Sequence, residues 1–137
     1  MKEFALICGA SGTIGQAIAK ELARSGWSLY LHYDSGLERV QSLVKEFTKE
    51  YDSQEFIPVQ ANFQTDEAAE LVAGQVFALH AIVFANGHAV YGLLEDHTPS
   101  QMTALWKVHV ETPMQIIQLL ASKLRQQQTS YITFISS

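Results

Sequence analysis

The sequence predicts an α/β fold with a doubly wound parallel sheet. Two observations lead to this prediction: short apolar segments alternate with segments of helical periodicity along the 137 residues, and a glycine-spaced turn directly follows the first apolar segment. Strands that are buried on both faces of a parallel sheet are short and mostly apolar, and helices connect them. With right-handed crossovers, we expect the strand order 3-2-1-4-5.

Each expected strand is short and apolar enough to be buried in such a sheet. A helix over residues 16–23 follows the first strand, and a helical stripe from Leu37 to Tyr51 follows the second. A weaker stripe covers residues 71–76. The expected strands are residues 3–8, 28–33, 55–61, 80–85 and 130–136.

The segment over residues 100–125 is expected to form one long helix, entered through Thr98, Pro99 and Ser100. Its apolar residues lie on more than one side, which predicts burial against the sheet on one side and against a second subunit on the other. These apolar residues are Met102, Leu105, Trp106, Val110, Met114, Ile117, Leu120 and Leu124.

Composition and charge limit the partners and cofactors to expect. A chain of 137 residues, 47% of them apolar, is about one domain with a real core. The net charge of −5 and the pI near 5.4 disfavour nucleic acid and anionic membranes as partners. Cys8 is the single cysteine and no histidine has a second ligand at metal-binding spacing, so neither a disulfide nor a metal site is expected. The start of the chain lacks a signal segment and no apolar run has membrane-spanning length, so we expect a cytoplasmic protein.

The turn after the first strand has the residue types of a phosphate cradle. A pyrophosphate can approach backbone N–H groups and the positive end of a helix only where no Cβ intervenes, which explains Gly12. Gly9 permits the tight turn, and Gly15 permits close packing of the helix on the strand. The alternative is a glycine loop that binds nothing. The predicted cofactor contacts in this turn are Gly9, Ser11, Gly12, Thr13, Ile14 and Gly15.

Two landmarks follow the first and third strands. The turn from Cys8 to Gly15 resembles the motif TGxxxGxG, with Cys8 for Thr and Thr13 for the middle Gly, although its glycine spacing is closer to TGxxGxxG. Asn62 and Phe63 follow the third strand, and proteins that carry this glycine motif have an Asp at that place, which contacts the adenine amino group.

Two more landmarks follow the fourth and fifth strands. The segment Phe84-Ala85-Asn86-Gly87 is similar to the motif NNAG, without its first two Asn residues, and Ala85, Asn86 and Gly87 are candidate cofactor contacts. Residues 135–137 resemble the strand end that presents a catalytic serine, here Ser137. Together the four landmarks resemble the short-chain dehydrogenase/reductase family along the whole chain.

This resemblance implies that residues 1–137 form an NAD(P)-binding Rossmann domain. In the family, a Tyr follows the serine by about a dozen residues and donates a proton, and a Lys four residues later lowers the pKa of that Tyr. Both residues would lie beyond Ser137, so the resemblance implies a domain that is incomplete on its C-terminal side. It also implies a homodimer or homotetramer for the full-length protein.

The family has a fourth catalytic residue, an Asn on the long helix, and His109 aligns with it. Pro113 has no N–H, so the carbonyl of His109, four positions earlier, is expected to lose its helical partner. In the family, that carbonyl holds a water of the proton relay. The alternative is that Pro113 simply kinks the helix.

The end of the second strand is expected to select the cofactor. NAD-specific members carry an acid about 20 residues past the glycine turn, and here that position is Tyr33. Because Tyr33 does not repel a 2′-phosphate, NADP(H) is favoured over NAD(H). The neighbouring Asp34, and Gly12 where many NADP-dependent members have a basic residue, favour the opposite choice. In a purely structural alternative, Asp34 and Ser35 only form a turn and cap the next helix.

Two functions from different classes follow. The first is a carbonyl reductase that transfers hydride between NADP(H) and a small-molecule or acyl-thioester substrate. Residues 32–35 resemble the Asn-Tyr-x-x-Ser loops of 3-oxoacyl-acyl-carrier-protein reductases, which implies acyl carrier protein as a partner. The second is a non-catalytic dinucleotide-binding or regulatory protein, because several family positions are substituted here.

Overall fold

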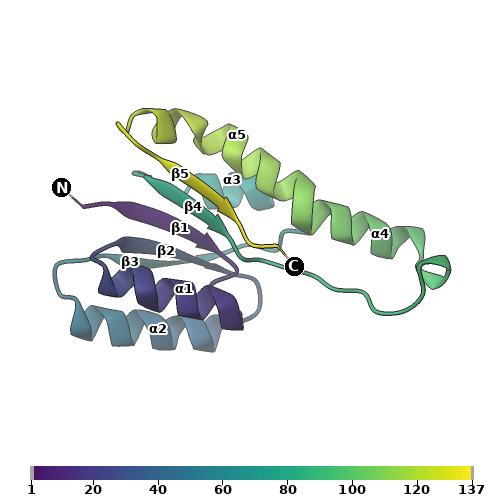
Figure 1. Ribbon diagram of the computed structural model, residues 1–137, viewed down its shortest axis with the longest axis horizontal. Coiled ribbons are helices and arrows are strands. Elements are labelled where there is room, and N and C mark those ends of the chain that lie inside the picture. The colour runs from purple at the N-terminus through teal and green to yellow at the C-terminus, as the bar shows by residue number, and fades with distance from the viewer. Residues whose placement is uncertain (1, 137) are drawn as a thin grey trace.

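The computed structural model describes residues 2–136 as a five-stranded sheet with helices on both faces (Figure 1). The strand order is β3-β2-β1-β4-β5, and all four pairings are parallel. The predicted fold class and strand order are therefore confirmed. The strands are β1 (Phe4–Cys8), β2 (Ser28–Tyr33), β3 (Phe56–Gln60), β4 (Ala81–Phe84) and β5 (Tyr131–Phe134).

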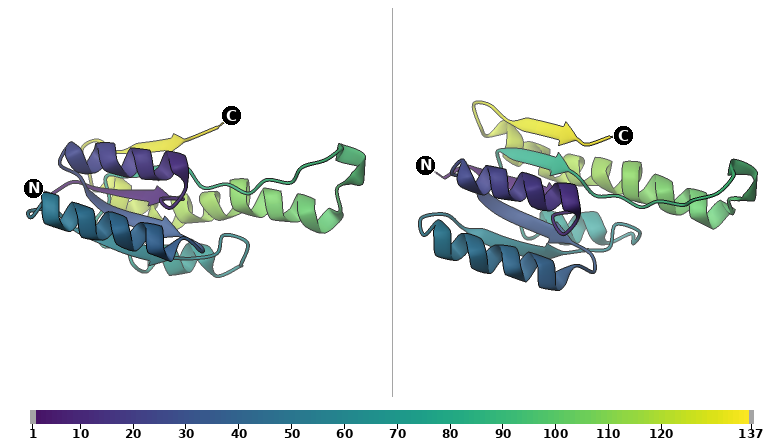
Figure 2. Two further views of the ribbon diagram at one scale, coloured as in Figure 1. Left: turned by 90° about the horizontal axis from the view of Figure 1, so that it is seen from below. Right: turned by 60° about the horizontal axis from the view of Figure 1, so that its bottom comes forward.

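Two pairs of helices cover the sheet (Figures 1 and 2). Helices α1 (Thr13–Arg24) and α2 (Leu37–Glu50) lie on one face, and α3 (Ala68–Ala73) and α5 (Thr112–Arg125) lie on the other. The side chains of β1 alternate between the two resulting cores, as the period of a strand requires. All five residues of β1 are buried, and burial raises the pKa of the Cys8 thiol, which makes Cys8 an inert packed residue.

The long segment differs from its prediction, because it is not one regular α-helix. It consists of α4 (Pro99–Trp106), a π-helical turn η2 (Lys107–Glu111) and α5. Thr98 begins α4 with a capping box, in which its side chain accepts a hydrogen bond from the Gln101 N–H. The π turn ends at Glu111, two residues before Pro113, which cannot donate a backbone hydrogen bond.

Only part of the long segment packs on the sheet. The buried residues Ile116, Leu120 and Leu124 join the core, whereas every residue of α4 is exposed or half-buried. The second apolar side, which includes Trp106 and Met114, faces outward, and its burial by another subunit stays a prediction.

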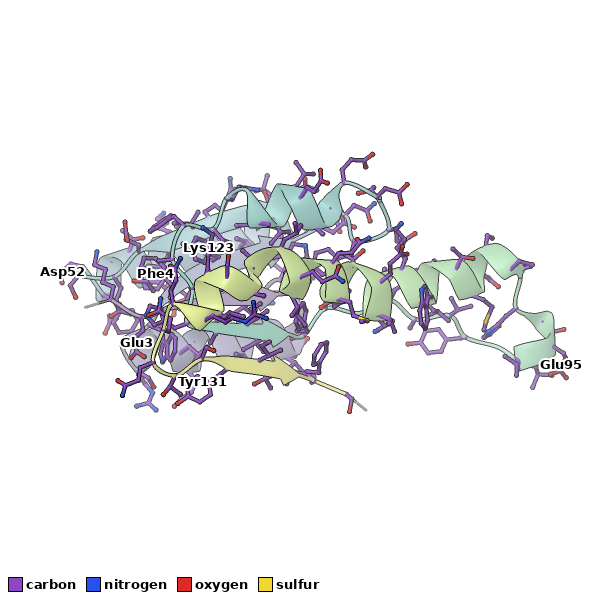
Figure 3. The ribbon with its side chains drawn as sticks, turned by 90° about the horizontal axis from the view of Figure 1, so that it is seen from above. Glu3, Phe4, Asp52, Glu95, Lys123 and Tyr131 are labelled. Atoms are coloured by element: carbon purple, nitrogen blue, oxygen red, sulfur yellow. The ribbon has the colours of Figure 1, made fainter. Side chains whose placement is uncertain are left out.

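The connection between β4 and α4 extends away from the sheet (Figure 2). It includes a short 3-10 helix, η1 (Leu94–Asp96). Figure 3 shows Glu95 at the far tip of this projection, whereas Phe4, Lys123 and Tyr131 lie at the body of the sheet. The projection therefore takes no part in forming the sheet, whose carboxyl edge carries the site described next.

Candidate functional site

A cavity of about 270 Å³ lies where the carboxyl ends of the central strands meet. Ligands of open α/β sheets bind at this edge, where the strand order reverses. Most of the predicted cofactor contacts line it, and they come from four different connections. Those residues are Gly9, Ser11, Gly12, Asp34, Ser35, Asn62, Phe63, Ala85, Asn86 and Gly87.

The glycine turn leaves an open path to the N-terminus of α1. Gly9 has a φ of +80°, and a Cβ there would lie 2.6 Å from the backbone of Asn86. A Cβ on Gly15 would lie 2.0 Å from the Gly9 carbonyl oxygen, so Gly15 accommodates the turn itself and not only the strand. At Gly12 a Cβ would meet only that oxygen at 3.5 Å, and Gly12 lines the cavity.

The start of α1 has the properties of an anion site. Within residues 2–136, no side chain caps this helix at Gly12, and its first turn contains no acidic residue. Its free N–H groups and its dipole favour a negative group at this end. The space at Gly12 and the uncapped helix fit a pyrophosphate. Thr13, Ile14 and Gly15 belong to the helix start and do not line the cavity.

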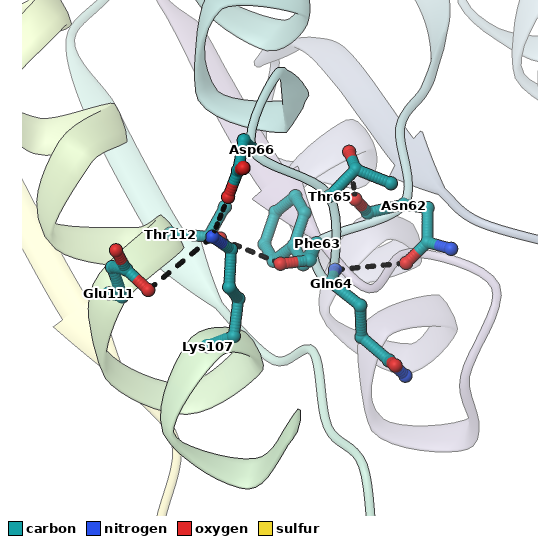
Figure 4. A network of polar contacts seen from close by, with 8 residues as sticks. All are labelled: Asn62, Phe63, Gln64, Thr65, Asp66, Lys107, Glu111 and Thr112. Carbon is teal, nitrogen blue, oxygen red and sulfur yellow. Dashed lines mark hydrogen bonds and ion pairs between the residues drawn. The ribbon is translucent and has the colours of Figure 1, made fainter. Parts of the chain in front are cut away.

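The connection after β3 is held against the π turn (Figure 4). The Thr112 hydroxyl donates a hydrogen bond to the Phe63 carbonyl at 2.7 Å. Lys107 forms an ion pair with Asp66, and its Nζ lies 3.5 Å from a Glu111 carboxylate oxygen. The Lys107 side chain is only 13% exposed, so this pair is shielded on one side. These contacts fix the wall of the cavity that Phe63 forms.

Asn62 differs chemically from the family Asp in this wall. Its side-chain oxygen accepts a hydrogen bond from the Gln64 N–H at 2.9 Å, and its backbone carbonyl accepts one from the Thr65 hydroxyl. The amide nitrogen, a donor, points away from this turn in Figure 4. Asn62 therefore offers a donor where the family Asp offers an acceptor, so the two cannot contact an adenine amino group in the same way.

Asn86 connects the loop after β4 to the π turn. Its side-chain nitrogen donates a hydrogen bond to the Val108 carbonyl at 2.9 Å. In the π turn the Thr112 N–H bonds the Lys107 carbonyl, five residues earlier, and the next residue in this register is Pro113, which has no N–H for Val108. In an α-helix, counting four residues back from Pro113 gives the His109 carbonyl. In the π turn the count is five, so Pro113 provides no N–H for the Val108 carbonyl, and the Asn86 side chain donates to it instead.

The other amide atom of Asn86 is available to a ligand. Among residues 2–136, its buried Oδ1 has no hydrogen-bond partner, and Asn86 lines the cavity. Because buried polar atoms are rarely left without a partner, this acceptor fits a cofactor that brings a hydroxyl or amide donor.

His109 faces the loop after β4 and does not line the cavity. Its Nε2 lies 2.9 Å from the His88 carbonyl oxygen and 3.2 Å from the His88 nitrogen. Ser137, the predicted catalytic serine, lies outside the described residues. The Ile135 N–H donates a hydrogen bond to the Phe84 carbonyl, so the segment that leads to Ser137 continues beside β4 toward the cavity edge.

The end of β2 also differs from its prediction. Tyr33 packs against the core beneath α1 and α2 and does not line the cavity, because successive side chains of a strand point to opposite faces. The preceding residue, His32, lines the cavity instead, together with Asp34 and Ser35. Sequence reasoning missed His32, although a histidine in an otherwise apolar buried strand was a visible signal.

The sequence pattern of the family described as short chain dehydrogenase matches residues 3–137. The chain belongs to this family. It is 28% identical over 138 residues to the uncharacterized oxidoreductase YmfI of Bacillus subtilis (strain 168), covering 100% of the chain and 57% of that relative. It is 26% identical over 141 residues to human 17-beta-hydroxysteroid dehydrogenase type 3, again over 100% of the chain and 45% of the relative. The chain thus spans about half the length of the curated relatives it matches.

Solved structures of the family share this fold. The angucycline C-6 ketoreductase LanV with bound NADP matches with a TM-score of 0.90 at 23% identity, over 98% of this chain and 55% of that one. A short-chain dehydrogenase from Burkholderia cenocepacia J2315 in complex with NADP matches with a TM-score of 0.82 at 29% identity, over 89% of this chain and 51% of that one.

Two further findings concern what this short-chain dehydrogenase chain does not contain within residues 2–136. These residues bring together no group of three or more His, Cys, Asp or Glu side chains that could hold a metal ion. None of their helices is long and apolar enough to cross a membrane. The residues that line the cavity offer backbone donors, amides, hydroxyls, the imidazoles of His32 and His88 and the carboxylate of Asp34.

Proposed function

We propose that this chain forms the NADP(H)-binding part of a reductase that transfers hydride between the cofactor and a carbonyl or alcohol substrate. The observation that carries the proposal is the uncapped start of α1, which opens beside Gly12 into a cavity at the reversal point of the sheet. When bound, the nicotinamide would supply or accept the hydride.

Three parts of the cavity would hold three parts of the cofactor. The glycine turn and the first N–H groups of α1 would bind the pyrophosphate. The wall formed by Asn62 and Phe63 would face the adenine. Asn86, with its unpaired acceptor, would bind a hydroxyl or amide donor on the nicotinamide side.

A preference for NADP(H) over NAD(H) is supported by the charges beside the second strand. Tyr33 points into the core and carries no charge to repel a 2′-phosphate. The Arg39 guanidinium lies 3.4 Å from the Ser11 carbonyl oxygen at the edge of the cavity, where it can attract an anion. Asp34, which also lines the cavity, acts in the opposite direction. Solved relatives such as LanV bind NADP, which agrees with the preference.

The whole protein would complete the reaction with groups beyond the described residues. We propose that Ser137 polarises the substrate carbonyl and that a Tyr and a Lys, later in the full-length protein, supply and tune the proton. Candidate substrates are small ketones and 3-oxoacyl thioesters presented by acyl carrier protein. We also propose a cytoplasmic homodimer or homotetramer. The part of His109 in this scheme is to position the loop at His88, since its imidazole bonds that backbone.

A non-catalytic dinucleotide-binding or regulatory protein is the second candidate. The position of the His109 side chain favours it, because this residue aligns with a catalytic Asn yet bonds the His88 backbone and does not line the cavity. The two candidates share cofactor binding and differ in turnover.

Fluorescence titration of the full-length protein with NADPH and NADH tests the cofactor proposal. NADPH is expected to bind at least about tenfold more tightly, and Arg39→Ala should remove most of that difference, since a charge-assisted bond contributes about 1.5–3 kcal/mol. Lys45→Ala, an exposed residue of the same helix, is the matched control for the lost charge. If NADPH and NADH bind equally well and Asp34→Ala creates a preference for NADPH, then Asp34 contacts the adenosine ribose and the proposed role of Arg39 is wrong.

Turnover separates the two candidate functions. Oxidation of NADPH by the full-length protein in the presence of a ketone or a 3-oxoacyl thioester supports the reductase. Tight NADPH binding without turnover of either substrate class supports the regulatory protein.

A further inference from the structure

His32 holds two walls of the cavity together through one buried ring. We propose that His32 is a positioning residue: its imidazole fixes the glycine turn in the shape that binds the dinucleotide, and it does so by accepting the Gly9 N–H. This inference rests on the proposed function, since it concerns the same cavity.

The hydrogen bonds of His32 define a single form of the ring. The Gly9 N–H donates to Nδ1 at 3.0 Å, so Nδ1 must be unprotonated. Nε2 lies 2.8 Å from the Ala61 carbonyl oxygen, which can only accept, so Nε2 must carry the hydrogen. The neutral ring with its hydrogen on Nε2 therefore satisfies both partners at once.

The backbone of His32 adds a second connection to the same turn. Its carbonyl accepts a hydrogen bond from the Ala10 N–H at 2.8 Å. Two consecutive N–H groups of the glycine turn, those of Gly9 and Ala10, are thus held by one residue of β2. Their orientation sets where the following N–H groups of the turn and of α1 point.

Burial leaves the ring little freedom to move. His32 is 3% exposed, and its ring stacks on the Phe63 ring with centroids 4.2 Å apart. Phe63 is itself fixed through its carbonyl, which accepts the Thr112 hydroxyl. The imidazole therefore lies between the glycine turn and the connection after β3, and it touches groups from both.

Loss of the Nδ1 acceptor would leave the Gly9 N–H without its side-chain partner. A half-buried donor without a partner is unfavourable, so the turn would rearrange to find another acceptor. Gly9 has a positive φ, and a change there would turn the neighbouring peptide groups that face the cavity. Cofactor affinity would fall even though His32 need not touch the pyrophosphate.

Two conservative variants separate the two ring nitrogens. In His32→Asn, the amide oxygen lies near the position of Nδ1 and can accept the Gly9 N–H, but the side chain does not reach Ala61. In His32→Gln, the longer amide can donate to the Ala61 carbonyl, but it leaves no acceptor at Gly9. The control His80→Asn alters another histidine that accepts a backbone N–H, that of Phe4 at 3.1 Å, at the opposite end of the sheet.

The dissociation constant for NADPH, measured by fluorescence on the full-length protein, is the first readout. His32→Asn and His80→Asn should keep it within about threefold of wild type, and His32→Gln should raise it about tenfold or more. Equal affinity of the Asn and Gln variants, whether weak or strong, would overturn the inference. A general loss of stability would not make His32→Gln bind NADPH more weakly than His32→Asn.

Hydrogen exchange of the Gly9 amide, followed by NMR without cofactor, is the second readout. Gly9 should be protected in wild type and in His32→Asn, and it should exchange faster in His32→Gln. Equal protection in His32→Gln would refute the positioning role. If wild type bound neither NADPH nor NADH, the proposed function would fail, whereas this exchange measurement would still decide the inference about His32.

Discussion

The buried imidazole of His32 should make the folded chain sensitive to acid. Burial lowers the pKa of His32 from 6.5 to about 4, and this effect outweighs the bond to the Ala61 carbonyl and the nearby charge of Asp34, both of which favour the protonated ring. Protonation would also place a hydrogen on Nδ1, where the Gly9 N–H already points. The folded state therefore resists a proton that the unfolded state accepts.

The sign and size of the effect follow from this difference in pKa. Between pH 6.5 and about 4 the unfolded chain binds a proton at His32 and the folded chain does not, so the free energy of unfolding falls as the pH falls. Above pH 6.5 both states are neutral at this residue and the contribution is fully present. About 2.5 pKa units correspond to about 3 kcal/mol lost by pH 4.

The assay is urea unfolding of wild type and of His32→Asn at several pH values from 7.5 to about 4. Other groups titrate in this range, but they titrate in both proteins, so the difference between the two isolates His32. The advantage of wild type over the variant should shrink by about 3 kcal/mol as the pH falls. His80→Asn should retain the dependence that is due to His32. A difference between wild type and His32→Asn that stays constant over this range would refute the reasoning.

Two further predictions concern the glycine turn and the π turn. Gly12→Ala should weaken NADPH binding by about tenfold or more and change the free energy of unfolding by less than about 1 kcal/mol. Gly15→Ala should destabilise the fold itself, because its Cβ would overlap the turn. Similar unfolding free energies for the two variants, measured in urea, would contradict this. Asn86→Leu should cost about 1–3 kcal/mol of stability by leaving the Val108 carbonyl unpaired, and much less in a Pro113→Ala background, where an N–H becomes available. An unchanged cost in the double-mutant cycle would show that Pro113 does not leave this carbonyl free.

The sequence was sufficient for the sheet and for most of the cavity. Strand positions followed from short apolar segments, and the strand order followed from the alternation of strands and helices, because right-handed parallel connections leave few arrangements. The residues at the carboxyl ends of the strands then had to meet at one edge. This is why the sequence alone could place Gly12, Asn62 and Asn86 together.

The errors at the site have two physical sources. Counting residues to the end of β2 selected Tyr33 together with Asp34 and Ser35, and it overlooked that side chains alternate along a strand. The cavity is lined by His32, Asp34 and Ser35, and Tyr33 packs on the other face. Counting four residues back from Pro113 assumed an α-helix, but the segment contains a π turn, in whose register the missing N–H of Pro113 belongs to the Val108 carbonyl. A free carbonyl at His109 stays a prediction. In both places the residue types indicated a site correctly, but the sequence did not show which residue of the strand or of the helical turn faces the cavity.

The shift at the π turn has a consequence for how the site is built. In an α-helical register Pro113 would face the His109 carbonyl, whereas in the π register it faces the Val108 carbonyl, which accepts the Asn86 side-chain N–H. The side-chain nitrogen of Asn86 is thereby engaged, and its oxygen is left as the acceptor that the cavity retains. His32 uses the same principle on the other wall, where one ring nitrogen holds Ala61 and the other holds Gly9. Each residue has two polar atoms, and one of them anchors the side chain so that the other has a fixed direction, which is the preorganisation a binding site needs.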